Sequence, residues 1–226
     1  MYTTMLFYGV AIISFIIVSA SQAYIRSSYK KYSKVKNSIH LTGKDAALKI
    51  LKTNNMSNVK VEEVSGFLSD HYDPSTKTVR LSTNNYNDAS IAAVSIAAHE
   101  CGHALQDKEG YFMLRLRASL VPLVNLSSKA GYLVIMIGVF ANLFKLVWIG
   151  ILLEMIILLF QLVTLPVEIN ASSRAMKQIK SIGLLSGNEV TKGRTMLISA
   201  ALTYVASVAS AIANILQLIL VYGRRD

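Results

Sequence analysis

The sequence has 226 residues but one cysteine and three prolines, and several long stretches lack charge altogether. With Cys101 alone, no intramolecular disulfide can form, which fits a reducing compartment. Residues 1–25 and 196–223 carry no charged side chain, and residues 131–167 carry only Lys145 and Glu154. These gaps argue against an ordinary soluble domain, because a soluble core does not gather its apolar residues in such long runs.

The uncharged stretches are long enough to cross a bilayer. The chain is 53% hydrophobic, its mean hydropathy is +0.43, and a spanning helix needs about 20 mostly apolar residues. We predict four transmembrane helices, the middle two forming a hairpin, at roughly 3–25, 123–144, 146–167 and 199–222. The first could be a cleaved signal peptide, since Ser19-Ala20-Ser21 has the small side chains of a cleavage site. No basic residue precedes it, however, so an uncleaved anchor is the better prediction.

The basic residues set the expected orientation of these helices. They cluster after the first span, before the second and after the third: Arg26, Lys30, Lys31, Lys34, Lys36, Arg115, Arg117, Arg174, Lys177, Lys180, Lys192 and Arg194. The loop between the second and third spans offers only Lys145. We therefore expect residues 26–118 and 168–198 in the cytoplasm and both termini outside, although Arg224 and Arg225 weigh mildly against this.

The net charge of +10 is explained on this view by attraction to the anionic inner leaflet. No basic patch interleaved with aromatic residues argues for nucleic acid, so we expect no nucleic-acid partner. The expected partners are the lipid bilayer and a peptide or protein substrate, and the sequence leaves the oligomeric state open.

The stretch from residue 37 to residue 118 has the pattern of a small α/β unit. Its expected elements, in chain order, are a helix from a Thr42 cap to about Asn54, strands at 59–64 and 78–82 with a turn at Asp73-Pro74 between them, and a helix from an Asn87 or Asp88 cap to about Asp107. Asp107 and Glu109 are interpreted as a solvated helix end.

The last of these helices contains AAHECGHALQ, residues 97–106, in which His99, Glu100 and His103 have the spacing H-E-x-x-H. Residues four apart share a helix face, so both imidazoles can turn to one ion. A catalytic zinc keeps three protein ligands and a water, and Glu100 would accept the proton of that water. The alternative is a polar helix end with solvent-facing histidines. The apolar residues 91–98 oppose it, because they would carry the motif into the interior, where histidines need partners.

A third zinc ligand must come from elsewhere in the chain. The remaining histidines are His40 and His71, but Glu168 at the inner end of the third span is the stronger candidate. An acidic residue at such a place is costly unless it is paired or bound to a metal. The alternative is an interfacial carboxylate paired with Arg174. Glu154 is the poorer choice, because it lies in the middle of a span, where we expect it to pair with another polar group.

Three stretches carry a resemblance to a known family: Ser69–Pro74 (SDHYDP), Ala97–Ala104 (AAHECGHA) and Gln161–Ala175 (QLVTLPVEINASSRA). They look like the bacterial family of membrane-bound neutral zinc metallopeptidases (YugP-like), and the similarity runs over nearly the whole chain. The resemblance implies a gluzincin-type site in which His99, His103 and Glu168 are ligands and Glu100 is the general base. It also implies a bacterial inner (cell) membrane.

The arrangement is more distantly similar to HtpX and the CAAX-prenyl proteases. Those carry an aspartate four residues after the third glutamate, where this sequence has Ser172. A partner that orients a ligand histidine must then come from elsewhere, with Asn170 or Asp73 as candidates.

In the same distant relatives, an edge strand before the H-E-x-x-H helix holds the substrate backbone by strand addition. By position, His71, Tyr72 and Asp73 would occupy that edge here, and His71 or Tyr72 could donate to the oxyanion. The alternative is a plain turn, for which Asp73-Pro74 is suitable. Cys101 lies inside the motif but points away from the zinc-binding neighbours, so core packing is expected rather than a redox switch.

The predicted fold is a mainly α membrane protein with about four transmembrane helices and a small cytoplasmic α/β gluzincin-like catalytic unit. Its segments are a membrane anchor, the cytoplasmic catalytic region with the motif, a transmembrane hairpin, a cytoplasmic segment that begins with the third ligand, and a last transmembrane helix with its tail: residues 1–25, 26–118, 119–167, 168–198 and 199–226.

The predicted function is a Zn²⁺-dependent integral membrane endopeptidase that acts on membrane-associated or locally unfolded proteins. One alternative is a non-catalytic membrane scaffold with a structural zinc, in which His71 closes the fourth position. Another is a transporter with a metal in its path, which ranks last because few polar residues lie deep in the spans.

Overall fold

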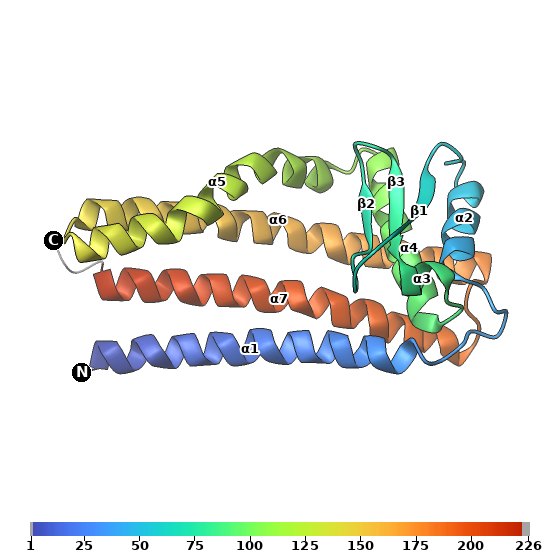
Figure 1. The fold of residues 1–226 in the computed structure, drawn as a ribbon, viewed down its shortest axis with the longest axis horizontal. Coiled ribbons are helices and arrows are strands. Elements are labelled where there is room, and N and C mark those ends of the chain that lie inside the picture. Colours follow the sequence, from blue (N-terminus) through green and yellow to red (C-terminus); the bar gives the residue numbers. More distant parts are fainter. Residues whose placement is uncertain (1, 223–226) are drawn as a thin grey trace. The chain divides into compact units, whose positions relative to one another are not determined.

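In the computed structural model, which describes residues 2–222 and the side chains from Tyr8 onward, the chain is mainly helical with one small sheet (Figure 1). The elements in chain order are α1 (Tyr2–Tyr32), α2 (Gly43–Thr53), β1 (Lys60–Val64), β2 (His71–Asp73), β3 (Thr78–Ser82), α3 (Thr83–Asn87), α4 (Ile91–Lys108), α5 (Phe112–Phe140), α6 (Phe144–Ile182) and α7 (Asn188–Tyr222).

Within the described residues, four helices are long and apolar enough to cross a membrane, as the sequence predicts: Tyr8–Tyr32, Phe112–Phe140, Phe144–Ile182 and Asn188–Tyr222. Each is longer than its predicted span, because the helix continues past the apolar stretch into polar sequence. The predicted end of the second span at residue 144 was wrong, because the chain turns after Phe140, with Asn142 at φ 55°, and the next helix begins at Phe144. Arg224 and Arg225, which weigh on the orientation, lie outside the described residues.

The chain divides into two compact units. The first holds residues up to Gln22, Arg115–Pro166 and residues from Leu202, so it is built from long apolar helix segments. Its side chains include Phe15 and Phe140, which are 73% and 78% exposed. Exposed apolar surface of this kind suits a lipid environment rather than water.

The second unit holds Ala23–Leu114 and Val167–Ala201 and contains the sheet. The strand order is β1-β3-β2, with β1 parallel and β2 antiparallel to the central β3. The strands expected at 59–64 and 78–82 are confirmed as β1 and β3. The edge position expected for His71, Tyr72 and Asp73 is also confirmed, because β2 forms one side of the sheet.

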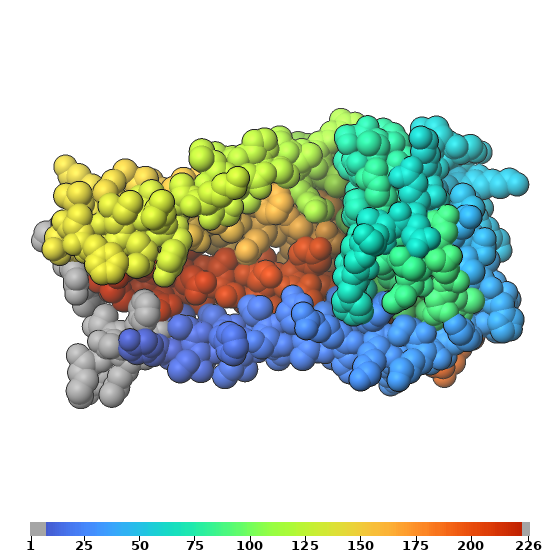
Figure 2. Space-filling view, viewed as in Figure 1, coloured from blue at the N-terminus to red at the C-terminus, as the bar shows by residue number. Residues whose placement is uncertain are grey.

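The core of the second unit lies between the sheet, α2 and α4, which stand beside one another in Figure 1. Val79 and Leu81 of β3 and Ile50 of α2 are fully buried there, and so is Ile179 of α6. Cys101 is buried in this cluster, so the expected packing role is confirmed. On the viewed face, residues of the strands form part of the surface of this unit (Figure 2).

The cap of the motif helix differs from the prediction. The sequence favoured Asn87 or Asp88, but Asn87 ends the short helix α3 and Asp88 is extended. Ser90 begins α4 instead, and its hydroxyl accepts a hydrogen bond from the backbone N–H of Ala93 at 3.2 Å. All three residue types cap helices well, so local preference alone could not choose among them. The Thr42 cap of α2 is confirmed, with Thr42 Oγ1 accepting from Asp45 N at 3.1 Å.

Candidate metal centre

Helices α4 and α6 approach each other closely within the second unit, and Gly102 makes this possible. A Cβ built on Gly102 would lie 2.4 Å from the carbonyl oxygen of Ala171, a distance that side chains do not tolerate. Ala171 itself is fully buried. The glycine of the motif therefore serves helix packing, which brings the histidines of α4 beside the start of the 167–182 part of α6.

Three side chains from these two helices converge, and we call His99, His103 and Glu168 the metal cluster. The Oε2 atom of Glu168 lies 3.2 Å from Nε2 of His99 and 3.6 Å from Nε2 of His103. One ligand atom from each residue lies within 4.8 Å of the others. Zinc ligands about 2.1 Å from the ion at tetrahedral angles stand about 3.4 Å apart, so the donor set and its spacing fit zinc.

The other candidates for the third position lie elsewhere. Within residues 2–222, the metal cluster contains neither His40 nor His71. Arg174, the alternative partner of Glu168, is held by Glu109 through an ion pair of 2.7 Å. Glu154 belongs to the first unit, where its Oε1 lies 3.1 Å from the position that a Cβ on Gly131 would take. Glu168 is thus the acidic residue that the fold brings to the two histidines.

Glu100 lies next to the cluster in the sequence and is only 7% exposed. Burial raises the pKa of its carboxyl, and this outweighs the lowering by the charges of His99 and His103. A carboxylate whose pKa is raised holds a proton more firmly than an exposed one. Glu100 is therefore better suited to proton transfer than an ordinary surface glutamate.

Each histidine of the metal cluster has a partner at its other ring nitrogen. Nδ1 of His99 lies 3.1 Å from the hydroxyl of Ser172, and Nδ1 of His103 lies 3.0 Å from Oε1 of Gln106. The expectation that such a partner cannot be Ser172 was wrong, because a serine hydroxyl reaches the imidazole as an aspartate would. Asn170 contacts Gln106 rather than a histidine, and Asp73 lies against Arg80.

Gln106 was missed by the sequence analysis, although it ends the quoted motif. It is fully buried, and its position three residues after His103 places it on the same side of α4. The available signal was its spacing of three from His103, because an amide on the same helix side as a buried histidine can serve as that histidine's partner.

The edge strand places its predicted site residues on opposite faces. Tyr72 lies opposite Val79 and His71 opposite Arg80, and successive strand residues alternate in direction. The hydroxyl of Tyr72 donates to Asp107 at 2.6 Å, and burial together with this bond raises the pKa of Tyr72. The ring of His71 is exposed, with Nδ1 2.8 Å from the carbonyl oxygen of Ser69.

Asp73 and the end of α4 are more engaged than the sequence suggested. Asp73 receives bonds from Ser75 and Thr76 and an ion pair from Arg80, which together hold the pKa of its carboxyl below its usual range. The turn chemistry at Asp73-Pro74 is thus confirmed alongside the edge strand. The solvated helix end was wrong in part, because Asp107 accepts from Tyr72 and Glu109 from Arg174.

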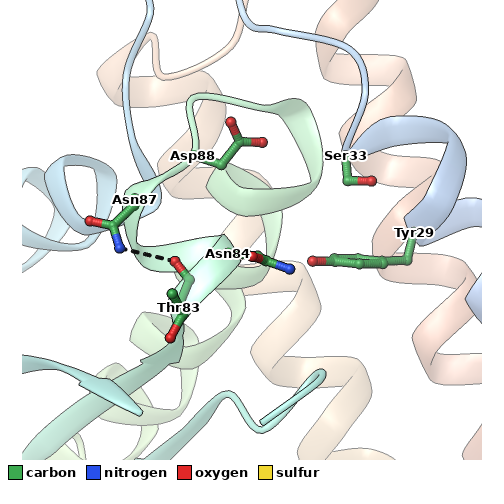
Figure 3. A pocket seen from close by; sticks show the side chains of 6 residues that line it. All are labelled: Tyr29, Ser33, Thr83, Asn84, Asn87 and Asp88. Carbon is green, nitrogen blue, oxygen red and sulfur yellow. Dashed lines mark hydrogen bonds between the residues drawn. The ribbon is translucent and has the colours of Figure 1, made fainter. Parts of the chain in front are cut away.

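A separate polar depression lies at the end of α1 (Figure 3), lined by Tyr29, Ser33, Thr83, Asn84, Asn87 and Asp88. Asn87 donates to the backbone oxygen of Thr83 at 3.2 Å, and Lys36 pairs with Asp88. None of these residues belongs to the metal cluster, so the depression is a feature of its own.

Comparison with known proteins gives two matches. A family model described as "Putative neutral zinc metallopeptidase" matches residues 7–223. The chain is also 42% identical over 202 residues to the "Putative membrane protease YugP" of Bacillus subtilis (strain 168), which covers 89% of this chain and 90% of that protein. No solved structure matches.

Proposed function

The chain belongs to the family of neutral zinc metallopeptidases, and from this premise we propose that it is a zinc-dependent membrane endopeptidase of gluzincin type. The observation that carries the proposal is the metal cluster. Two imidazoles lie four residues apart in the chain, and the carboxylate follows them by 65 or more residues. The three groups converge at the spacing of zinc ligands.

In this proposal His99, His103 and Glu168 hold the ion. Zinc, when bound there, supplies a water of lowered pKa and polarises the peptide carbonyl. With zinc bound, Glu100 would act as the general base that accepts a proton from the attacking water and as the acid that returns it to the leaving amine. The raised pKa of Glu100 supports the first of these steps, because a carboxylate of higher pKa is the stronger base.

The oxyanion needs a hydrogen-bond donor, and His71 or Tyr72 on β2 stays our proposal for it. Tyr72 would have to exchange its bond to Asp107 for one to substrate. His71 has an exposed ring, which would keep or exchange its contact with the carbonyl oxygen of Ser69. Catalytic hydrogen bonds often tighten only with substrate present. The two candidates are separated by comparing His71→Gln and Tyr72→Phe. Loss of the true oxyanion donor lowers kcat more than it raises KM.

The proposed substrate class rests on the position of β2 at the edge of the sheet. An edge strand leaves N–H and C=O groups that pair with an extended chain, so the segment to be cleaved must be locally unfolded. The four candidate spans support substrates at or near the bilayer. We place the site on the cytoplasmic side of the bacterial inner membrane, because the basic residues flank that side.

The test is digestion of an unstructured protein by the full chain purified in detergent. Wild type is expected to cleave it, to lose activity with a chelator and to regain it with zinc. Glu100→Gln is expected to bind zinc and to lose at least about 100-fold in kcat. If both forms bind zinc and neither cleaves any of several substrates, the scaffold with a structural zinc replaces the enzyme.

A further inference from the structure

A row of polar side chains runs from the surface end of α4 to the metal cluster, all within the second unit. The carboxylate of Glu109 binds the guanidinium of Arg174, whose Nε donates to Oδ1 of Asn170 at 2.7 Å. That same Oδ1 accepts from Nε2 of Gln106 at 3.0 Å. We call these four residues, Glu109, Arg174, Asn170 and Gln106, the polar relay.

The direction of every bond in the relay follows from Arg174, because a guanidinium only donates. The atom of Asn170 that faces Arg174 must be its oxygen, so the amide of Asn170 has one allowed orientation. Gln106 must then present its NH₂ group to Asn170. A second acceptor agrees, since Nε2 of Gln106 also lies 2.7 Å from the backbone oxygen of Val167, which cannot donate.

With its nitrogen committed, Gln106 can only present Oε1 to His103, 3.0 Å away. An amide oxygen accepts, so Nδ1 of His103 must carry a hydrogen. The single hydrogen of a neutral imidazole is then used, and Nε2 keeps its lone pair. Nε2 is the atom that lies 3.6 Å from Glu168.

We propose that the polar relay is a positioning device that fixes His103 in the one tautomer able to bind zinc through Nε2. Without it, the neutral ring could place its hydrogen on Nε2, where the carboxylate of Glu168 would accept it. That tautomer has no lone pair for a metal at the cluster. The relay acts through His103 alone, because His99 is held instead by Ser172, whose hydroxyl can either donate or accept.

This inference rests on the proposed zinc site and deepens it. The test is the zinc dissociation constant of the full chain, measured by competition with a chromophoric chelator. Gln106→Leu and Asn170→Leu are expected to weaken zinc binding by about 10- to 100-fold, and Arg174→Met by about 10-fold, as losses of partners behind a ligand do. Asn170→Asp is expected to bind close to wild type, because a carboxylate accepts from both Arg174 and Gln106.

A matched control separates positioning from general stability. Gln178 also lies on α6 and ties it to the C-cap of α2, since Nδ2 of Asn54 donates to its Oε1 at 2.9 Å. Within residues 2–222, its side chain bonds Asn54 and no residue of the metal cluster. Gln178→Leu is expected to lower the melting temperature about as much as Asn170→Leu while leaving zinc affinity unchanged.

Two outcomes overturn the relay, and they differ from a failure of the function. If wild type binds zinc and the leucine variants bind it equally well, the relay is wrong and the peptidase stands. The relay also fails if Asn170→Asp is as weak as Asn170→Leu. If wild type binds no zinc, the proposed function itself is wrong.

Discussion

His103 shows how single side chains control the metal cluster. Burial lowers the pKa of its imidazole, but the nearby carboxylates of Glu168 and Glu100, which favour the protonated ring, raise it more. A ligand nitrogen must be free of its proton to bind a metal. In the proposed zinc site, we therefore expect proton and zinc to compete at His103 at a higher pH than at an ordinary histidine.

Zinc affinity is expected to fall as the pH drops through a value above about 6.5, the usual imidazole pKa. The raised pKa fixes this direction, because the proton is still held where an ordinary imidazole has lost it. Chelator competition between pH 9 and pH 5.5 measures the dependence. An affinity that stays constant down to pH 6 would contradict the assigned environment of His103.

The second prediction at this scale concerns Ser172. Ser172→Ala removes the partner of His99 and is expected to weaken zinc binding by about 10-fold or more, as lost partners of ligand histidines do. Ser181→Ala on the same helix is the control, since the exposed hydroxyl of Ser181 donates to the backbone oxygen of Gln178, one turn away on the same helix. Equal zinc affinities for the two variants would show that Ser172 does not orient His99.

At the scale of elements, the packing of α4 on α6 sets the distance between the ligands. Gly102→Ala would press a methyl group against the carbonyl of Ala171 and is expected to cost about 1–3 kcal/mol of stability. It should also weaken zinc binding, because the helices that carry the ligands must move apart. Gly9→Ala is the control, with nothing near its added carbon. Thermal unfolding and zinc titration of both variants measure the effect, and a Gly102→Ala protein with wild-type zinc affinity would contradict it.

Most elements could be predicted from local patterns. Alternation of apolar residues located β1 and β3, and uncharged runs located the four long helices. Helix ends were harder, because Asn87, Asp88 and Ser90 are all good caps and only the packed chain selects Ser90. The bonds of Gln106 could not be predicted from local sequence, because its partners Asn170 and Val167 lie more than 60 residues away in the chain.

At the scale of the whole molecule, the candidate site combines a local sequence motif with a distant residue that had to be predicted from its chemistry. H-E-x-x-H is local, but its third ligand is not. Glu168 stood out because a carboxylate at the end of a span requires a partner. The orientation in the membrane was likewise argued from charge, and it makes a prediction of its own.

Single cysteines test that orientation. Ala141 lies in the turn between α5 and α6, and Ser181 lies near the end of α6; both are exposed. In intact cells, a membrane-impermeant maleimide is expected to label Ala141→Cys and to spare Ser181→Cys until the membrane is opened. Cys101 adds little background, because burial raises the pKa of its thiol. The reverse labelling pattern would place the site outside the cytoplasm.

The most direct test of the central claim, that His99, His103 and Glu168 form one zinc site, is the zinc content of four purified proteins. Wild type, Glu100→Gln and Glu154→Gln are expected to hold about one zinc per chain, and Glu168→Ala is expected to hold almost none after brief dialysis against a weak chelator. Glu154 is the matched control, an acidic residue on the same helix but outside the cluster. The proposed zinc site would be contradicted if Glu168→Ala kept its full zinc content, or if the wild-type protein held no zinc.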